Sequence, residues 1–299
     1  MTYQKVHADE VHTDAALLRQ LLTDQFPQWA ALPIAHVPST GTDHVLYRVG
    51  DDMVARLPRK QGVDEQVDKE REWLPRLAPL LPADVPVPLA KGRPGAAYPF
   101  SWSVYAWLEG ENPGFEGVDD ASVATDLARF VTALREIDAT GGPLAGAQNF
   151  YRGCPLAVRD EPTRAAIAEL GDMVDAKAVI EAWEAALGAT PWAGPPVWIH
   201  GDLNPENLLV RGGRLAAVID FGCLGAGDPA CDVMVAWTLL SADARDAFRA
   251  ALTVDDATWA RGRGWALSTG LIALPYYKDT NPARAANARY RIREVLADG

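Results

Sequence analysis

Four polar residues in the second half of the chain have types and spacing suited to phosphoryl transfer. His200, Asp202 and Asn207 form the pattern His-x-Asp-x-x-x-x-Asn, and Asp220 follows within an Asp-Phe-Gly sequence. Transfer of a phosphoryl group needs a positioned acceptor hydroxyl and charge neutralisation by metal. Asp202 is the candidate catalytic base, and Asn207 and Asp220 are candidate Mg²⁺ ligands. We expect His200, the second candidate catalytic residue, to brace this loop; the alternative is that these carboxylates are ordinary turn residues.

A β-hairpin is predicted to place the two metal-ligand candidates. One apolar, β-branched run starts at Asn207 and another ends at Asp220, and Gly212 and Gly213 between them supply the positive φ values of a tight turn. Pairing about those glycines puts Asn207 opposite Val218 and diagonal to Asp220. Diagonal neighbours lie roughly 7–8 Å apart, within reach of one shared ion.

The composition fits a globular enzyme with two domains. The chain has 299 residues, of which 48% are hydrophobic and 23% charged. Its net charge of −12 disfavours nucleic acid, whose phosphates would be repelled. The same charge suits a cationic small substrate, although solubility alone also explains it.

Neither a membrane span nor a secretory signal is predicted. The longest apolar runs are shorter than the roughly 18 residues that cross a bilayer, and the start of the chain is polar. Cys154, Cys223 and Cys231 lack CxxC spacing, so we expect no disulfide and no structural metal. These features indicate a cytoplasmic protein without membrane contact, either a monomer or a homodimer.

The first third of the chain is expected to form a helix and a β-hairpin. Thr13 or Asp14 is a suitable cap for a helix that ends at Pro27, and a hairpin is predicted over residues 44–57 with its turn at Gly50. The preceding loop contains three residues, Thr40, Gly41 and Thr42, whose backbone amides are candidates to lie over phosphates.

Arg56 is a candidate phosphate ligand. It lies in the middle of a predicted strand, where a charge among apolar neighbours needs a partner, and Glu70 on the following helix is the favoured one. A strand cation held by a helix carboxylate can bind the α- and β-phosphates of a nucleotide. The alternative is that Arg56 occupies the exposed side of an alternating strand.

A further strand over residues 101–108 is expected to lead into a crossing between the domains. The backbone at Ala106 and Leu108 is the candidate contact for a purine base. Helices are predicted over residues 120–137, 161–174, 176–187 and 233–240. Before the last of these, Asp228 and Asp232 are expected mainly to cap the helix, with a contact to the 200–207 loop as the secondary interpretation.

The last sixty residues combine aromatic and acidic side chains. Trp259, Trp265, Tyr276 and Tyr277 occur with Asp255, Asp256 and Asp279. They could line a pocket for a polyhydroxylated or polyamine compound, and core packing with surface charge explains them equally well.

The motifs His-Gly-Asp-Leu-Asn-Pro-Glu-Asn, Ile-Asp-Phe-Gly and Gly-Asp-Pro-Ala-Cys-Asp together resemble those of the aminoglycoside phosphotransferase family. The resemblance implies an α+β, protein-kinase-like bilobal fold, with a nucleotide-binding lobe over residues 1–108 and a catalytic lobe over residues 109–299. It also implies ATP or GTP as donor, Mg²⁺, and a hydroxylated small-molecule acceptor. By matching position, Asp202 resembles the base, Asn207 and Asp220 the metal ligands, and Arg56 with Glu70 the phosphate-binding pair.

Three departures from the family pattern concern the ligands. Arg56 replaces the usual lysine, His44 stands where asparagine is frequent, and the C-terminus lacks the acidic-aromatic tail of aminoglycoside 3'-kinases. The favoured function is phosphorylation of an aminoglycoside-like antibiotic. The alternatives are a kinase of a macrolide, peptide antibiotic, amino alcohol or other metabolite, and a non-catalytic nucleotide-binding module.

Overall fold

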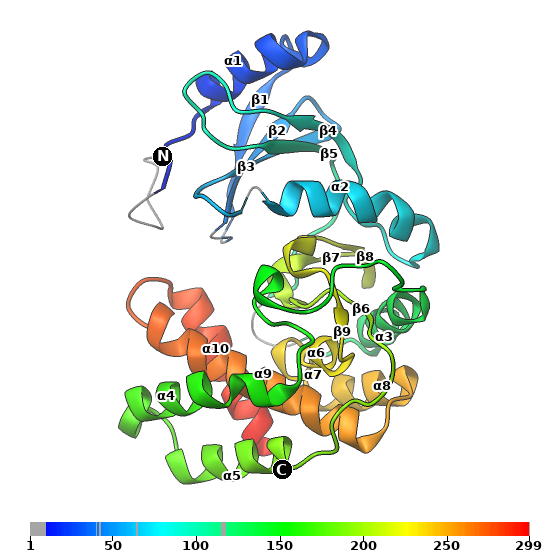
Figure 1. The fold of residues 1–299 in the computed structure, drawn as a ribbon, viewed down its shortest axis with the longest axis vertical. Coiled ribbons are helices and arrows are strands. Elements are labelled where there is room, and N and C mark those ends of the chain that lie inside the picture. The colour runs from blue at the N-terminus through cyan, green and yellow to red at the C-terminus, as the bar shows by residue number, and fades with distance from the viewer. Residues whose placement is uncertain (1–9, 40, 42, 64, 115–117, 299) are drawn as a thin grey trace. The chain divides into compact units, whose positions relative to one another are not determined.

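The computed structural model describes residues 10–39, 41, 43–63, 65–114 and 118–298 (Figure 1). The chain divides into two compact units, one formed by residues 1–79 and 84–109 and the other by residues 80–83 and 110–299. The smaller unit contains an antiparallel sheet and the larger one is mostly helical, so the predicted α+β class is confirmed.

The smaller unit is built around one sheet. In its described residues the five strands are ordered β1-β2-β3-β5-β4, and each neighbouring pair is antiparallel. Its elements are α1 (Ala15–Gln25), β1 (Ile34–Val37), β2 (His44–Val49), β3 (Met53–Pro58), α2 (Glu65–Leu77), β4 (Pro88–Gly92) and β5 (Trp102–Ala106).

The core of this unit lies between the sheet and α1. Leu18, Leu21 and Leu22 on one stripe of α1 are fully buried against inward-facing side chains of β2, β3 and β5. Asp14 caps the helix by accepting a hydrogen bond from the backbone N–H of Leu17 at 2.7 Å. The capped helix and the 44–57 hairpin that the sequence predicts are thus confirmed.

The larger unit consists mainly of helices, and its described strands form two short antiparallel pairs, β6–β9 and β7–β8. Its elements are α3 (Ala121–Glu136), α4 (Asp160–Leu170), α5 (Ala176–Leu187), β6 (Val197–Ile199), β7 (Leu208–Arg211), β8 (Arg214–Val218), β9 (Gly225–Gly227), α6 (Ala230–Val233), α7 (Val235–Thr238), α8 (Ala242–Leu252), α9 (Asp256–Tyr277) and α10 (Pro282–Ala297).

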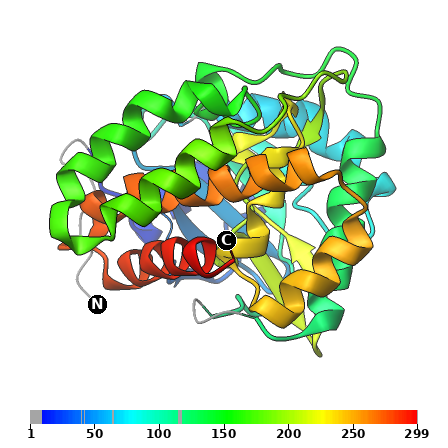
Figure 2. The same cartoon turned by 90° about the horizontal axis from the view of Figure 1, so that it is seen from below.

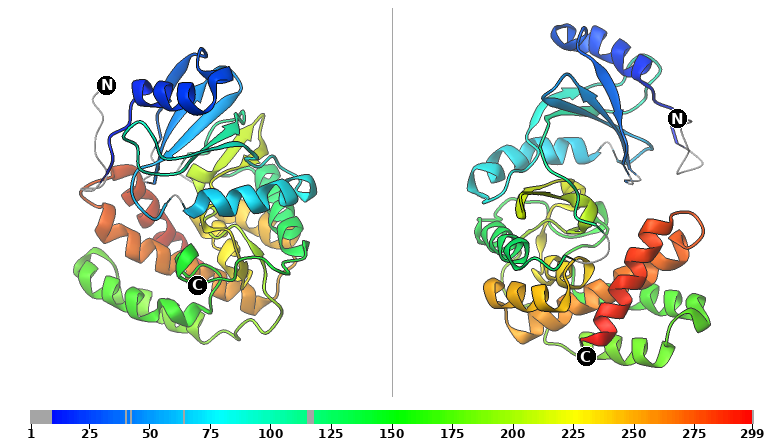
Figure 3. Two further views of the ribbon diagram at one scale, coloured as in Figure 1. Left: turned by 45° about the horizontal axis from the view of Figure 1, so that its top comes forward. Right: turned by 180° about the vertical axis from the view of Figure 1, so that it is seen from behind.

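Helix α9 is the centre of this unit. It packs against α4, α5, α6 and α10 (Figure 2), and α10 follows it as a neighbouring helix (Figure 3, right). Buried residues occur all round α9, as expected for a helix surrounded by others. None of the helices in the described parts of the chain has the length and apolarity needed to cross a lipid bilayer.

The helix predicted over residues 233–240 is wrong in its extent. Two short helices, α6 and α7, occupy this stretch and break at Met234. Val233, Val235 and Thr238 are β-branched and fully buried. Because β-branched residues favour the helix only weakly, contacts in the core decide the backbone conformation here.

Candidate active site

The β7–β8 hairpin is present, but its register differs from the prediction. Near the turn Val210 pairs with Leu215, whereas beyond an irregularity between Leu209 and Val210 the pairing shifts by one residue. Asn207 therefore bonds to Ile219, whose N–H donates to the Asn207 carbonyl at 2.8 Å, and it does not face Val218. A bulge is an extra residue in one strand, which symmetric pairing about the turn could not predict.

His200 fixes the loop that carries the candidate base. Its side chain is fully buried, with Nδ1 accepting from the Asp202 N–H at 3.2 Å and Nε2 donating to the Ile219 carbonyl at 3.0 Å. Its ring packs on Phe221, with the ring centroids 4.6 Å apart. The imidazole thereby ties the loop to the end of β8, an arrangement that suits the bracing role.

Asp232 holds the same loop in place through two hydrogen bonds. Its carboxylate accepts the backbone N–H groups of His200 and Gly201, both at 2.7 Å, and its side chain is 1% exposed. Gly201 has φ +82°, and a Cβ there would lie 2.7 Å from the Cys223 carbonyl oxygen. The sequence interpretation of Asp232 mainly as a helix cap is therefore wrong: its oxygens serve the loop, because the Gly201 turn directs two buried N–H groups at them.

The side chains of Asp202 and Asn207 lie together. The Asn207 amide nitrogen donates to the Asp202 carbonyl at 2.9 Å and to its Oδ2 at 3.1 Å, and Asn204 donates to the same two atoms at 3.0 and 3.1 Å. The Asp202 side chain remains 38% exposed. One carboxylate oxygen is thus fixed by two amides while the group stays accessible to a substrate.

Asn207 and Asp220 fit a magnesium site by the chemistry of their donors. Because the Asn207 amide nitrogen faces Asp202, its oxygen is directed away from that hydrogen bond. Asp220 has a left-handed backbone (φ 61°, ψ 74°) at the end of β8, and its Oδ1 accepts from the Gly222 N–H at 3.4 Å. No cluster of three or more His, Cys, Asp or Glu side chains suited to a metal occurs among the described residues. Two protein oxygens are sufficient for Mg²⁺, which keeps several waters and substrate phosphates as ligands.

Arg152 is a neighbour of Asp202 that the sequence did not reveal. Its Nη2 lies 3.7 Å from Asp202 Oδ1, and its side chain is 16% exposed. The loop before it holds two successive left-handed residues, Phe150 (φ 56°) and Tyr151 (φ 61°), and is anchored by buried Asn149, whose amide donates to the Arg152 carbonyl at 2.9 Å. Strained backbone of this kind is concentrated at functional sites.

In the smaller unit, Arg56 and Glu70 form the ion pair that the sequence favours. Arg56 Nη1 lies 3.1 Å from both Glu70 oxygens, and its Nη2 lies 3.3 Å from Nδ1 of His44. Tyr105 also donates to Glu70, and burial together with the Glu70 charge raises the pKa of this phenol well above its usual value. Glu70 is 2% exposed, so the pair is held firmly at the junction of β3, β5 and α2.

The other nucleotide-binding candidates also belong to this unit. Gly41 is partly exposed, and its N–H donates to the Ser39 hydroxyl at 3.0 Å, whereas Thr40 and Thr42 lie outside the described residues. Ala106 ends β5 opposite Met53, and Leu108 follows beyond the strand; both are partly exposed.

Two of the acidic residues near the C-terminus make local contacts, as a helix cap and as a surface ion pair. Asp255 caps α9 by accepting the Thr258 N–H at 2.6 Å, and Asp256 is exposed and pairs with Arg249 at 2.7 Å. Trp265 is completely buried. The residues of this region that come near Asp202 are basic, and they are considered below.

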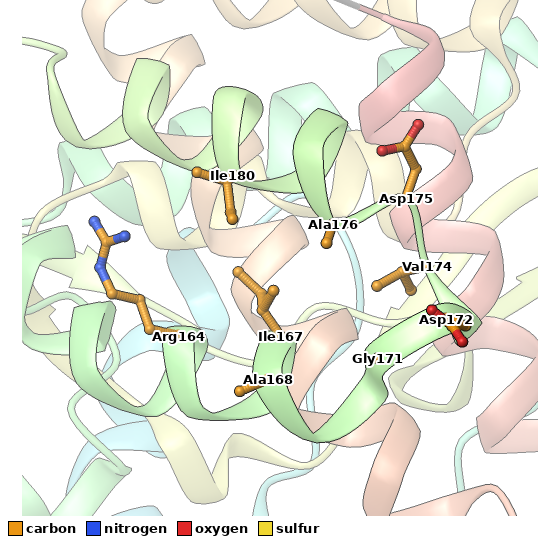
Figure 4. A pocket seen from close by; sticks show the side chains of 9 residues that line it. All are labelled: Arg164, Ile167, Ala168, Gly171, Asp172, Val174, Asp175, Ala176 and Ile180. Carbon is orange, nitrogen blue, oxygen red and sulfur yellow. The ribbon is translucent and has the colours of Figure 1, made fainter.

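A hollow of about 720 Å³ lies elsewhere in the larger unit, between α4 and α5 (Figure 4). Its lining includes Ile167, Val174 and Ile180, with Arg164 at one end. None of the predicted site residues lines it. It is an open apolar groove that is separate from the Asp202 loop.

Known proteins similar to this chain are phosphotransferases. The model of the phosphotransferase enzyme family matches residues 35–265. Aminoglycoside 3'-phosphotransferase of Escherichia coli is 38% identical over 60 residues, and this match spans 20% of the chain but only 22% of that relative's length.

Solved structures share the fold over almost the whole chain. The GDP and kanamycin complex of APH(2")-IIia has a TM-score of 0.73 at 18% identity, covering 94% of this chain and 99% of that one. Macrolide 2'-phosphotransferase MphH from Brachybacterium faecium has a TM-score of 0.62 at 24% identity, covering 94% and 97%. These similarities confirm the predicted protein-kinase-like fold. The family match spans more than half of the sequence, including every candidate catalytic and metal-binding residue, and we conclude that the chain belongs to the phosphotransferase enzyme family.

Proposed function

We propose that this protein transfers the γ-phosphate of ATP or GTP to a hydroxyl group of a small molecule. The observation that carries the proposal is the grouping of Asp202, Asn207 and Asp220 around one braced loop and the end of one hairpin. A protein that only binds nucleotide has no need of an accessible carboxylate beside the proposed metal ligands.

Asp202 is proposed as the base for the acceptor hydroxyl. The hydroxyl oxygen forms a bond to the γ-phosphorus as the bond to the β-phosphate oxygen breaks. The nucleoside diphosphate leaves with that electron pair, and the hydroxyl proton goes to Asp202. A positioned base of this kind contributes ~10²- to 10⁴-fold in rate. The two amides on one Asp202 oxygen hold the other oxygen in a fixed direction.

Asn207 and Asp220 are the residues proposed to hold Mg²⁺, which would neutralise negative charge on the transferred group. In the smaller unit, Arg56 fixed by Glu70 is proposed to bind the α- and β-phosphates. Gly41 is proposed to offer its backbone to the phosphates, and the backbone at Ala106 and Leu108 to contact the base. Structural relatives solved with GDP and with ADP support a nucleotide as the donor.

The acceptor favoured by the sequence is an aminoglycoside-like antibiotic. Relatives support it through a kanamycin complex and a gentamicin complex, while the macrolide phosphotransferases support the alternative of another hydroxylated antibiotic or metabolite. A cytoplasmic small-molecule kinase that is a monomer or homodimer remains our expectation.

The proposal is tested by incubating the protein with Mg²⁺ and ATP or GTP across aminoglycosides, macrolides, amino alcohols and hydroxy acids. Nucleoside diphosphate release and mass spectrometry of the acceptor are measured. We expect acceptor-dependent release and a product heavier by one phosphoryl group. Binding of the magnesium nucleotide without a phosphorylated product from any acceptor would favour the non-catalytic module.

A further inference from the structure

Four arginines in the larger unit lie within electrostatic reach of Asp202 or of its neighbour Arg152. Arg152 lies on the loop before η4 (Leu156–Arg159), Arg159 ends η4, and Arg284 and Arg291 lie two turns apart on one side of α10. Arg152 is within electrostatic reach of Arg159, Arg291 and Asp202. The sequence motifs gave no sign of this cluster, because its members come from separate segments.

Two of these cations, Arg159 and Arg291, have neutral hydrogen-bond partners. Arg159 donates to the Ser268 hydroxyl at 3.2 Å, and Arg291 donates to the Asn287 amide oxygen at 2.8 Å and the Thr269 hydroxyl at 3.3 Å. Among the described residues, neither has a carboxylate within ion-pair distance. Both side chains are partly buried, so their charges are poorly compensated by solvent.

Arg152 is also short of partners. Its contacts are Asp202 Oδ1 at 3.7 Å and the Met234 sulfur at 3.9 Å, and its buried Nε makes no hydrogen bond within the described chain. The Trp265 ring packs against both Arg152 and Arg159, with its centroid 5.8 Å from the first guanidinium carbon and 5.7 Å from the second. This packing fixes the position of two guanidinium groups that lack full ionic partners.

The acidic groups nearby are already engaged. Glu206 pairs with Arg284 at 2.7 Å. The Asp232 oxygens accept hydrogen bonds from the backbone N–H groups of His200 and Gly201. Burial, reinforced by the neighbouring Arg152 charge, lowers the pKa of Arg159 to about 10. Although the chain has a net charge of −12, positive charge gathers beside the proposed base.

We propose that the acceptor molecule carries an anionic group, a carboxylate or a phosphate, which binds Arg152 and Arg291 while its hydroxyl faces Asp202. Arg159 strengthens the positive potential at this subsite. The planar donor fork of a guanidinium matches both kinds of anion. The inference rests on the proposed function, since it names the substrate class of the same site, and it disfavours polycationic aminoglycosides, which these arginines would repel.

The alternative is that the arginines only hold the helices together. Buried cations with a purely structural role normally have carboxylate partners, as Arg245 does with Glu294 and Asp298 at 2.8 and 3.1 Å. The contrast between Arg245 and Arg291 indicates that the missing anion comes from outside the chain.

Binding of small anions tests the subsite without any need for turnover. The melting temperature of the wild-type protein is measured with the magnesium nucleoside diphosphate present, and inorganic phosphate or acetate is compared with chloride at equal ionic strength. We expect phosphate or acetate to raise the melting temperature above the chloride value. The same titration is repeated with Arg291→Gln and with Arg289→Gln, a matched control at an exposed position of the same helix.

The effect should disappear in Arg291→Gln and persist in Arg289→Gln. Equal responses to phosphate, acetate and chloride in the wild type, or an unchanged anion response in Arg291→Gln, would overturn the inference. Phosphate and acetate compared with each other show which anion the subsite prefers.

Matched acceptors provide the second arm. Glucose, gluconate and glucose 6-phosphate share a polyol and differ in the anionic group, and kanamycin supplies a polycation. We expect the enzyme to turn over gluconate or glucose 6-phosphate faster than glucose or kanamycin. The Arg291→Gln substitution should raise the KM for that anionic acceptor roughly 10- to 100-fold, with a smaller change in kcat. Preferential phosphorylation of kanamycin would refute the anionic acceptor while supporting the proposed function. Anion binding with no magnesium-nucleotide binding would instead refute the proposed function.

Discussion

Replacement of Asp232 by alanine removes the only side-chain acceptor described for two buried backbone N–H groups, those of His200 and Gly201. A buried donor without a partner costs about 1–3 kcal/mol, so the free energy of unfolding should fall by about 2–6 kcal/mol. For a unit of this size that corresponds to a decrease of roughly 4–24 °C in the melting temperature. Asp232→Asn should fall between wild type and alanine, since its amide offers one acceptor and one donor.

The loop should also lose its geometry, so kcat should decrease in the folded fraction. The assay combines thermal unfolding with nucleoside diphosphate release below the transition, and Asp246→Ala, at an exposed position on α8, is the control. A variant at position 232 that melts and turns over like the control would show that the loop does not depend on this carboxylate.

Three further predictions concern single contacts. Glu70→Gln should raise the KM for the nucleotide in steady-state assays, because Arg56 loses the charge that orients it; an unchanged KM would refute the role of the pair. Gly201→Ala should lower the melting temperature, since its Cβ would lie 2.7 Å from the Cys223 carbonyl, and a stable, active variant would contradict this conformation. Arg214 holds the pKa of Asp126 below its ordinary value, so the pair stabilises the fold at neutral pH and this contribution is lost as pH falls through the lowered pKa. Asp126→Asn should therefore melt below wild type at pH 7 but not in strong acid, and a constant difference across the pH series would contradict the linkage.

The sequence predicted those parts of the fold that depend on local signals. The α1 cap, the hairpin turn at Gly50 and the helix over residues 176–187 follow from neighbouring residues, and each is present. The Arg56–Glu70 pair was also predictable, because a charged residue in a buried strand needs a partner.

Features that depend on contacts between distant segments could not be predicted from local sequence patterns. The irregularity in the β7–β8 pairing and the break at Met234 have no signal in the neighbouring residues. Asp232 was assigned mainly to its own helix because the buried N–H groups that it accepts come from a loop about thirty residues earlier. The arginines near Asp202 come from the loop before η4, from η4 itself and from α10, and no sequence motif connects these segments.

The most direct test of the central claim is a comparison of wild type with Asp202→Asn, in which magnesium-nucleotide affinity is measured by calorimetry and turnover by diphosphate release. The substitution keeps the size of the side chain and its hydrogen bonds to neighbouring amides nearly intact, but removes the proton acceptor. We predict nearly unchanged affinity and melting temperature with turnover lower by ~10²- to 10⁴-fold. Turnover at the wild-type rate in Asp202→Asn would contradict the assignment of this loop as the catalytic centre.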